Sequence, residues 1–219
     1  MNNNIFITGG TGYIGSRISP ILLKNGFNVT ALVRKESINK LPANCKAVEG
    51  NALDEKTFQE YVKGCDTFIQ LVGVSHPSPS KKEEFKKIDL ASMTASVNAA
   101  KYAGVKHFIY LSVAQPAPMM KEYIEVRKRG EKLLEENEIP ASVIRPWYII
   151  GPGHYWPVVL TPIYKILELI PATREQAINL GLVKLGEMLN TILYAVKNPP
   201  AEGSRIYRTA DIRNGGIGK

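Results

Sequence analysis

Short apolar runs alternate with longer segments of helical periodicity along the first 146 residues of the chain. Each run has five or six residues, many of them β-branched or aromatic, and the runs occupy residues 4–8, 28–33, 46–50, 67–72, 107–112 and 141–146. The longest helical segment extends from Lys82 to Tyr102 and carries Leu90, Met93 and Val97 on one side. Nearly continuous apolar strands that alternate with helices predict βαβ units. We therefore expect an α/β fold with a doubly wound parallel sheet covered by helices on both faces.

The pattern changes after residue 150. The segment "GPGHYWP" (151–157) is a turn-rich break, an apolar segment follows over 158–170, and "INLGLVKLGEMLNTILYAVKN" predicts a short strand followed by a helix. These final 69 residues are too few for an independent domain. We expect one domain over residues 1–219, in which 151–219 forms a small cap or substrate-side extension. The last residues, "RNGGIGK", contain no anchoring group and are expected to be disordered.

Three glycines spaced three residues apart follow the first apolar run, in "TGGTGYIG" (8–15). Gly9 permits a tight turn, Gly12 lets the backbone approach a pyrophosphate, and Gly15 lets the next helix pack closely on the strand. The start of that helix supplies N–H groups and a positive dipole. We expect a dinucleotide-binding loop, with an ordinary strand-to-helix turn as the alternative; its residues are Gly9, Gly10, Thr11, Gly12, Tyr13, Ile14 and Gly15.

The residues after the second run indicate which dinucleotide would bind. An acidic residue there binds the ribose 2'-hydroxyl of NADH, whereas a basic residue accepts the 2'-phosphate of NADPH. Arg34 stands 19 residues beyond Gly15, Lys35 follows it, and the first acid is Glu36. This order favours NADPH over NADH.

Further cofactor contacts are expected where other runs end, because ligands of open α/β sheets lie outside the carboxyl ends of the strands. In "GNALD" (50–54), two residues are expected at the adenine. Residues at the ends of the fourth and sixth runs, and directly after them, are expected near the nicotinamide. The positions concerned are Asn51 and Ala52 for the adenine, and Leu71, Val72, Gly73, Pro146, Trp147 and Tyr148 for the nicotinamide end.

Five segments occur in an order that resembles one protein family. "TGGTGYIG", "GNALD", "YLSV", "YIEVR" and "RPWYIIGPG" are similar to the corresponding segments of atypical short-chain dehydrogenase/reductases, a group of NAD(P)H-binding, NAD-dependent epimerase/dehydratase-like proteins. The likeness extends from residue 4 to about residue 155. It implies a Rossmann-like fold and NAD(P)H as cofactor.

The resemblance also implies three catalytic residues, Ser112, Tyr123 and Arg127. In this superfamily the tyrosine hydroxyl exchanges a proton with the substrate oxygen while hydride moves to or from the nicotinamide. The third position holds lysine in the family and Arg127 in this chain, on the same helix face as Tyr123 because the two are four residues apart. The alternative is that Tyr123 is a partly buried helix residue and Arg127 a surface ion-pair partner of Glu131.

The aromatic residues around the break after residue 146 suggest the kind of substrate. If they converge, they form a flat, mostly apolar pocket; otherwise they seal the cap onto the sheet. The residues are Trp147, Tyr148, His154, Tyr155 and Trp156, with Met119 and Met120. We expect an NADPH-dependent oxidoreductase acting on a small, mostly apolar carbonyl, quinone or flavin-like acceptor. The alternative is a non-catalytic NAD(P)H-binding sensor or an accessory or assembly subunit of a larger complex. His76, in a Pro/Ser-rich loop, is expected to be exposed.

Charge and composition narrow the remaining possibilities. The chain carries 28 Lys and Arg against 20 Asp and Glu, a net charge of +8 that favours an anionic ligand. In "KKEEFKK" (81–87) acids and bases are mixed as on a solvated helix face, so no nucleic-acid partner is expected. No apolar run approaches the length of about 18 residues that a membrane span needs. Two cysteines without CxxC spacing predict no metal site. We expect a cytoplasmic monomer or homodimer.

Overall fold

Seven parallel strands form the central sheet of the computed structural model, which describes residues 3–75, 77–117 and 119–217. Their order is β3-β2-β1-β4-β5-β6-β9, so the direction of winding reverses between β1 and β4. The expected doubly wound parallel sheet is confirmed, and each of the six predicted runs begins at the first residue of a strand. The strands are β1 (Asn4–Thr8), β2 (Asn28–Val33), β3 (Lys46–Glu49), β4 (Thr67–Gln70), β5 (His107–Leu111), β6 (Ala141–Ile144) and β9 (Ser204–Tyr207).

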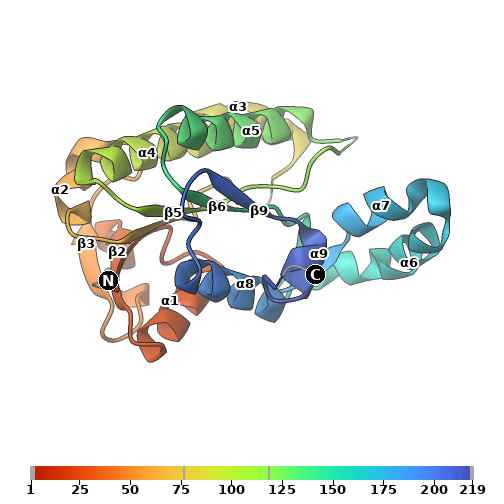
Figure 1. Cartoon of the computed structure of the whole chain (residues 1–219), viewed down its shortest axis with the longest axis horizontal. Coiled ribbons are helices and arrows are strands. Elements are labelled where there is room, and N and C mark those ends of the chain that lie inside the picture. The colour runs from red at the N-terminus through yellow and green to blue at the C-terminus, as the bar shows by residue number, and fades with distance from the viewer. Residues whose placement is uncertain (1–2, 76, 118, 218–219) are drawn as a thin grey trace.

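Helices cover both faces of this sheet, as Figure 1 shows. One face packs against α1 (Gly15–Lys24), α8 (Leu185–Lys197) and α9 (Thr209–Arg213), and the other against α2 (Gln59–Val62), α4 (Ala91–Ala103) and α5 (Lys121–Glu136). Successive side chains of a strand point to opposite faces. In β1, Ile5 and Ile7 therefore join the core beneath α1 and α8, while Phe6 joins the core beneath α4 and α5. The strands are buried on both sides, which explains their nearly continuous apolar sequence.

The predicted helix from Lys82 to Tyr102 is divided into three parts. It consists of α3 (Lys82–Glu84), the π-helical η4 (Phe85–Leu90) and α4. A π-helical turn shifts the residues that follow around the helix axis. In this turn Asp89 is almost fully buried, at 1% exposure, although its neighbours Lys86 and Lys87 are exposed. Four short 3-10 turns complete the connections: η1 (Lys35–Lys40), η2 (Glu55–Thr57), η3 (Pro79–Lys81) and η5 (Trp156–Leu160).

Residues beyond 150 contribute both to the central layers and to a projection. The predicted strand and helix are present as β8 (Leu182–Lys184) and α8, and β8 pairs with β7 (Tyr148–Ile150) in a second, two-stranded sheet. β9 pairs with β6 and so covers an edge that would otherwise expose unpaired backbone groups. α6 (Thr161–Leu169) and α7 (Pro171–Asn179) extend beyond the end of the sheet (Figure 1). Residues 151–219 thus contribute α8, β9 and α9 to the central layers, whereas α6 and α7 project from them.

The expected disorder of the last residues is wrong for 213–217. The Arg213 Nε donates to the Leu182 carbonyl at 3.0 Å, and its guanidinium pairs with Glu168 at 3.3 Å. Ile212, just before it, is fully buried. A single arginine therefore anchors this end between β8 and α6. Residues 218–219, like His76, lie outside the described residues, and no helix within the described ranges is long and apolar enough to span a bilayer.

Candidate functional site

The loop between β1 and α1 has a geometry that only glycine permits at two positions. Gly9 has a φ of +78°, and a Cβ there would lie 2.8 Å from the Leu71 carbonyl carbon. A Cβ on Gly15 would lie 2.7 Å from the Gly10 Cα. The N–H of Gly12 donates to the Gly9 carbonyl at 3.0 Å, and Gly12 itself is exposed. The loop therefore presents bare backbone beside the first turn of a helix, which fits a pyrophosphate.

The Tyr13 ring links this loop to the break after β7. The Arg17 guanidinium lies 4.3 Å from the centroid of the Tyr13 ring, and the His154 ring lies 4.2 Å from it. Arg17 also donates to the Tyr13 carbonyl at 2.8 Å. A Cβ on Gly151 would lie 2.5 Å from the Tyr13 hydroxyl, so glycine is needed where the two segments meet. Tyr13 thus fixes the outer part of the loop, between Thr11 and the buried Ile14.

Arg34 and Lys35 lie at the carboxyl end of β2, the strand beside β1. The Arg34 side chain is 77% exposed, and its Nε lies 3.3 Å from the Glu36 carboxylate. Lys35 is also exposed and begins η1. Both cations therefore lie at the same end of the sheet as the glycine loop.

Asn51 and Ala52 form the turn after β3. The Asn51 side chain accepts from the Leu53 N–H at 3.0 Å, while its own N–H donates to the Thr57 hydroxyl at 2.9 Å. Ala52 packs against the core beneath α4. The Asn51 side chain is thus engaged within its own turn, which lies at the carboxyl end of β3.

A buried ion pair joins α5 to the π-helical turn. The Arg127 Nη2 lies 2.5 Å from the Asp89 Oδ1, and the two side chains are 6% and 0% exposed. Arg127 Nη1 donates to the Leu111 carbonyl at 2.8 Å, and the second Asp89 oxygen accepts from the Val74 N–H at 3.0 Å. Burial raises the pKa of the Asp89 carboxyl, although Arg127 and the Val74 N–H oppose that rise. A Cβ on Gly73 would collide with the guanidinium.

This pair corrects the alternative that Arg127 is a surface partner of Glu131. Arg127 is buried because the sheet-facing side of α5 directs it to the ends of β4 and β5. Tyr123 shares that helix face, as the spacing predicts: the Arg127 Cζ lies 5.1 Å from the centroid of its ring. The Tyr123 ring packs on Phe85 at 5.0 Å and remains partly exposed. The Tyr110 ring also lies near the guanidinium, 5.7 Å from the Arg127 Cζ, and burial raises the pKa of Tyr110 to about 12.

A second buried network surrounds Ser112. Its hydroxyl donates to the Glu131 Oε1 at 2.6 Å, and the same oxygen accepts from Gln115 Nε2 and Arg145 Nε, each at 2.9 Å. Arg145 also pairs with the other Glu131 oxygen. Ser112 is only 3% exposed. Sequence reasoning missed Asp89, Gln115 and Arg145 as partners, because each lies on a different element from the residue it contacts.

An apolar pocket of about 370 Å³ lies between the carboxyl end of the sheet and α6–α7. The aromatic residues and methionines that the sequence predicted to converge do not all reach this pocket. Met119, Trp147 and Tyr148 line the pocket, whereas Met120 packs beside Tyr123 and the His154 ring lies tilted against Tyr13. Tyr155 and Trp156 are largely exposed, with Trp156 edge-on to Tyr148. Sequence reasoning missed the wall that α6 supplies, which includes Ile163, Tyr164 and Leu167.

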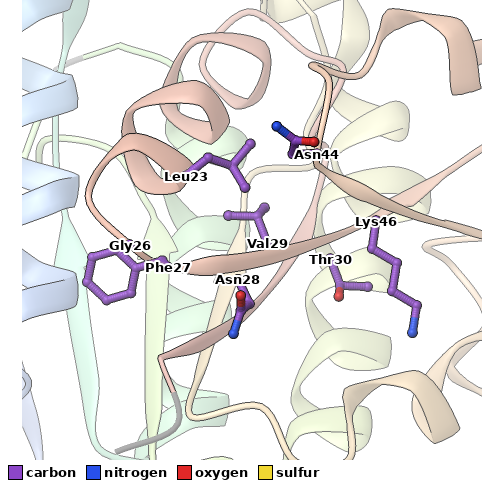
Figure 2. Close-up of a pocket in the computed structure, with 8 residues that line it drawn as sticks. All are labelled: Leu23, Gly26, Phe27, Asn28, Val29, Thr30, Asn44 and Lys46. Atoms are coloured by element: carbon purple, nitrogen blue, oxygen red, sulfur yellow. The ribbon is translucent and has the colours of Figure 1, made fainter.

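A second hollow, of about 430 Å³, lies far from these residues. Figure 2 shows that it is bordered by Asn28, Asn44 and Lys46, at the amino ends of β2 and β3. The glycine loop, Arg34 and Tyr123 belong to the opposite end of the sheet. The ligand site expected at the carboxyl ends therefore does not include this hollow.

The chain is similar in sequence to known NAD(P)H-binding proteins. The family model described as NAD(P)H-binding matches residues 9–155. A ceramide reductase from Caulobacter vibrioides is 25% identical over 151 residues, which cover 68% of this chain and 47% of the reductase. A decarboxylating sterol-4-alpha-carboxylate 3-dehydrogenase from Dictyostelium discoideum is 32% identical over 114 residues, which cover 50% of this chain and 35% of the dehydrogenase. The chain spans less than half the length of either relative.

Solved structures show the same fold. The Bordetella bronchiseptica enzyme WbmH, in complex with NAD+, aligns with a TM-score of 0.69 at 20% identity, over 94% of this chain and 75% of WbmH.

Proposed function

Since the chain belongs to the NAD(P)H-binding family, we propose that it is an NADPH-dependent oxidoreductase that acts on a small, mostly apolar carbonyl, quinone or flavin-like acceptor. One observation carries the proposal: the glycine loop and the apolar pocket lie at the same end of the sheet. When bound, the reduced nicotinamide supplies a hydride. The relatives named as a ceramide reductase and a sterol carboxylate dehydrogenase support an apolar substrate.

The proposed preference for NADPH depends on the cations after β2. The backbone of residues 9–15 would hold the pyrophosphate, and the turn at Asn51 and Ala52 would lie beside the adenine. Arg34 and Lys35 would hold the 2'-phosphate. The ion pair of Arg34 with Glu36 is exposed, and such pairs contribute little free energy. The guanidinium can therefore exchange this carboxylate for a phosphate, with which it forms bidentate hydrogen bonds.

Tyr123 is the proposed proton donor to the acceptor oxygen. Ser112 directs its own proton to Glu131, so its hydroxyl can accept a hydrogen bond from a ligand but does not donate one. Arg127 has its charge paired with Asp89 and its guanidinium beside the Tyr123 ring. We assign it a positioning role: it holds α5, and with it Tyr123, against the ends of β4 and β5. The backbone that follows the carboxyl ends of β4 and β6 would line the nicotinamide end of the site, at Leu71, Val72, Gly73 and Pro146.

NADPH oxidation measured by absorbance tests this function, with a long-chain aldehyde, a short-chain quinone and a free flavin as acceptors. Tyr123→Phe is expected to lower kcat about a hundredfold or more, because positioned general acids contribute that much, and to leave NADPH affinity unchanged. Tyr61→Phe is the matched control, since Tyr61 is 54% exposed on α2. An unchanged kcat in Tyr123→Phe would exclude this tyrosine as the proton donor.

A second candidate function is a non-catalytic NAD(P)H-binding sensor or accessory subunit. The observation that favours it is that two of the three residues implied as catalytic are held in buried networks, Arg127 by Asp89 and Ser112 by Glu131. This function predicts cofactor binding without turnover of any of the three acceptors. It also predicts that Tyr123→Phe has no effect.

A further inference from the structure

The segment formed by η5 and α6 exposes a continuous series of large apolar side chains. No residue of α6 is buried, although its sequence, TPIYKILEL, is mostly apolar. Single exposed apolar residues are common on soluble proteins, whereas a contiguous group marks an interaction surface. We name this group the η5–α6 surface; it consists of Tyr155 (61% exposed), Trp156 (58%), Val159 (72%), Ile163 (55%), Ile166 (60%) and Leu169 (83%).

The helix is apolar on two sides. Ile163 and Ile166, three residues apart on α6, lie on one exposed stripe, and the exposed Ile170 follows directly after the end of the helix. Tyr164 and Leu167 line the apolar pocket. A helix that is apolar beyond its inward side is typical of one that also contacts another apolar phase.

The charges on and around this surface indicate what it contacts. Lys165 on α6 and Arg174 on α7 are exposed, and so is Glu175, whose charge offsets one of them. Glu168 is paired with Arg213, at 3.3 Å, so its charge is compensated within the chain. The whole chain carries a net charge of +8. An anionic partner is therefore attracted, whereas a second copy of the chain is repelled.

We propose that the η5–α6 surface docks on an anionic lipid bilayer. Aliphatic side chains enter the outer part of the apolar layer, as in helices that lie in the plane of a membrane interface. Trp156 and Tyr155 lie at one end of the stripe, and these residue types are enriched at membrane–water interfaces. Lys165 and Arg174 face the headgroups.

Docking would also connect the bilayer to the pocket. Ile163 belongs both to the exposed stripe and to the pocket wall. An apolar acceptor dissolved in the bilayer would reach the pocket along α6 without crossing water. This route depends on the proposed function, whereas docking itself does not.

Vesicle flotation of the full chain tests the proposal. The probes are vesicles of phosphatidylcholine alone and of phosphatidylcholine mixed with phosphatidylserine. The chain is expected to float with the mixed vesicles, more weakly at high salt, and the emission of Trp156 is expected to shift to the blue. Ile166→Glu and Leu169→Glu should each weaken binding about tenfold or more, because each replaces an aliphatic side chain of the proposed bilayer contact by a carboxylate. Tyr61→Glu, at an exposed position of α2, is the matched control and should bind normally.

Three results would overturn docking. These are no flotation with either vesicle, equal weakening by Tyr61→Glu, or a stable dimer in analytical ultracentrifugation that Ile166→Glu dissociates. Far-UV circular dichroism of every variant reports whether it is folded, independently of NADPH binding. Because flotation and NADPH oxidation are measured separately, a chain that floats without turnover would retain the docking proposal and lose the catalytic one.

Discussion

Replacing Arg127 by methionine distinguishes a positioning role from a catalytic one. The Arg127 side chain is 6% exposed and is bonded to Asp89 and to the Leu111 carbonyl. Its removal leaves the fully buried Asp89 carboxylate without its cationic partner. Removing one member of a buried ion pair costs about 3–5 kcal/mol. We expect the free energy of unfolding of Arg127→Met to fall by about this amount.

A double-mutant cycle separates the pair from its surroundings. Asp89→Asn leaves Arg127 buried without its counter-ion and should also be destabilising. The double variant should lose less than the sum of the two single losses, by up to about 3 kcal/mol, because neither buried charge then remains unpaired. Urea unfolding at pH 7, with the slope m compared among variants, measures these values.

The same variants report on function. If Arg127 acts by positioning, folded Arg127→Met retains part of its turnover, and Arg127→Lys, which restores the family lysine, does not increase it. The reasoning is refuted if Arg127→Met loses less than about 1 kcal/mol of stability while its turnover disappears.

Three other predictions concern the loop, the sheet and the thiols. Gly15→Ala should abolish NADPH binding and destabilise the fold by about 1–3 kcal/mol, because its Cβ would collide with the Gly9 carbonyl oxygen and lie 2.7 Å from the Gly10 Cα. Gly186→Ala, with open space around it, should do neither. Burial lowers the pKa of His107 from 6.5 to about 4, so the unfolded chain binds more protons between these pH values. Burial of neutral His107 should therefore contribute about 3 kcal/mol to the free energy of unfolding above pH 6.5, and this contribution should be lost as the pH falls to 4. Urea unfolding at a series of pH values measures the loss, which His107→Gln should not show. Burial also raises the pKa of Cys45 and Cys65 from 9.0 to about 11, so thiol titration at pH 8 should find about a hundredfold less thiolate in the native than in the unfolded chain.

Local pattern predicted much of the fold. The six runs of the first 146 residues begin where strands begin, because a strand buried on both faces must be apolar throughout. The positions of the loop glycines could also be predicted from the sequence, because backbone conformation and close backbone packing require glycine at positions 9 and 15.

Long-range contacts were not predictable in this way. Arg127 finds its partner 38 residues earlier, in a π-helical turn, and a period of 3.6 residues gives no sign of such a turn. β9 joins the sheet beside β6 after an intervening projection of two helices. The wall of the apolar pocket on α6 was missed for the same reason, because Ile163 and Leu167 also satisfy the pattern of an ordinary amphipathic helix.

Calorimetric titration with NADPH and with NADH, for the native chain and for Arg34→Ala, tests the central claim most directly. We predict that NADPH binds more tightly than NADH and that Arg34→Ala removes the difference without weakening NADH. A well-folded chain that binds neither nucleotide would contradict the proposed function in both its forms.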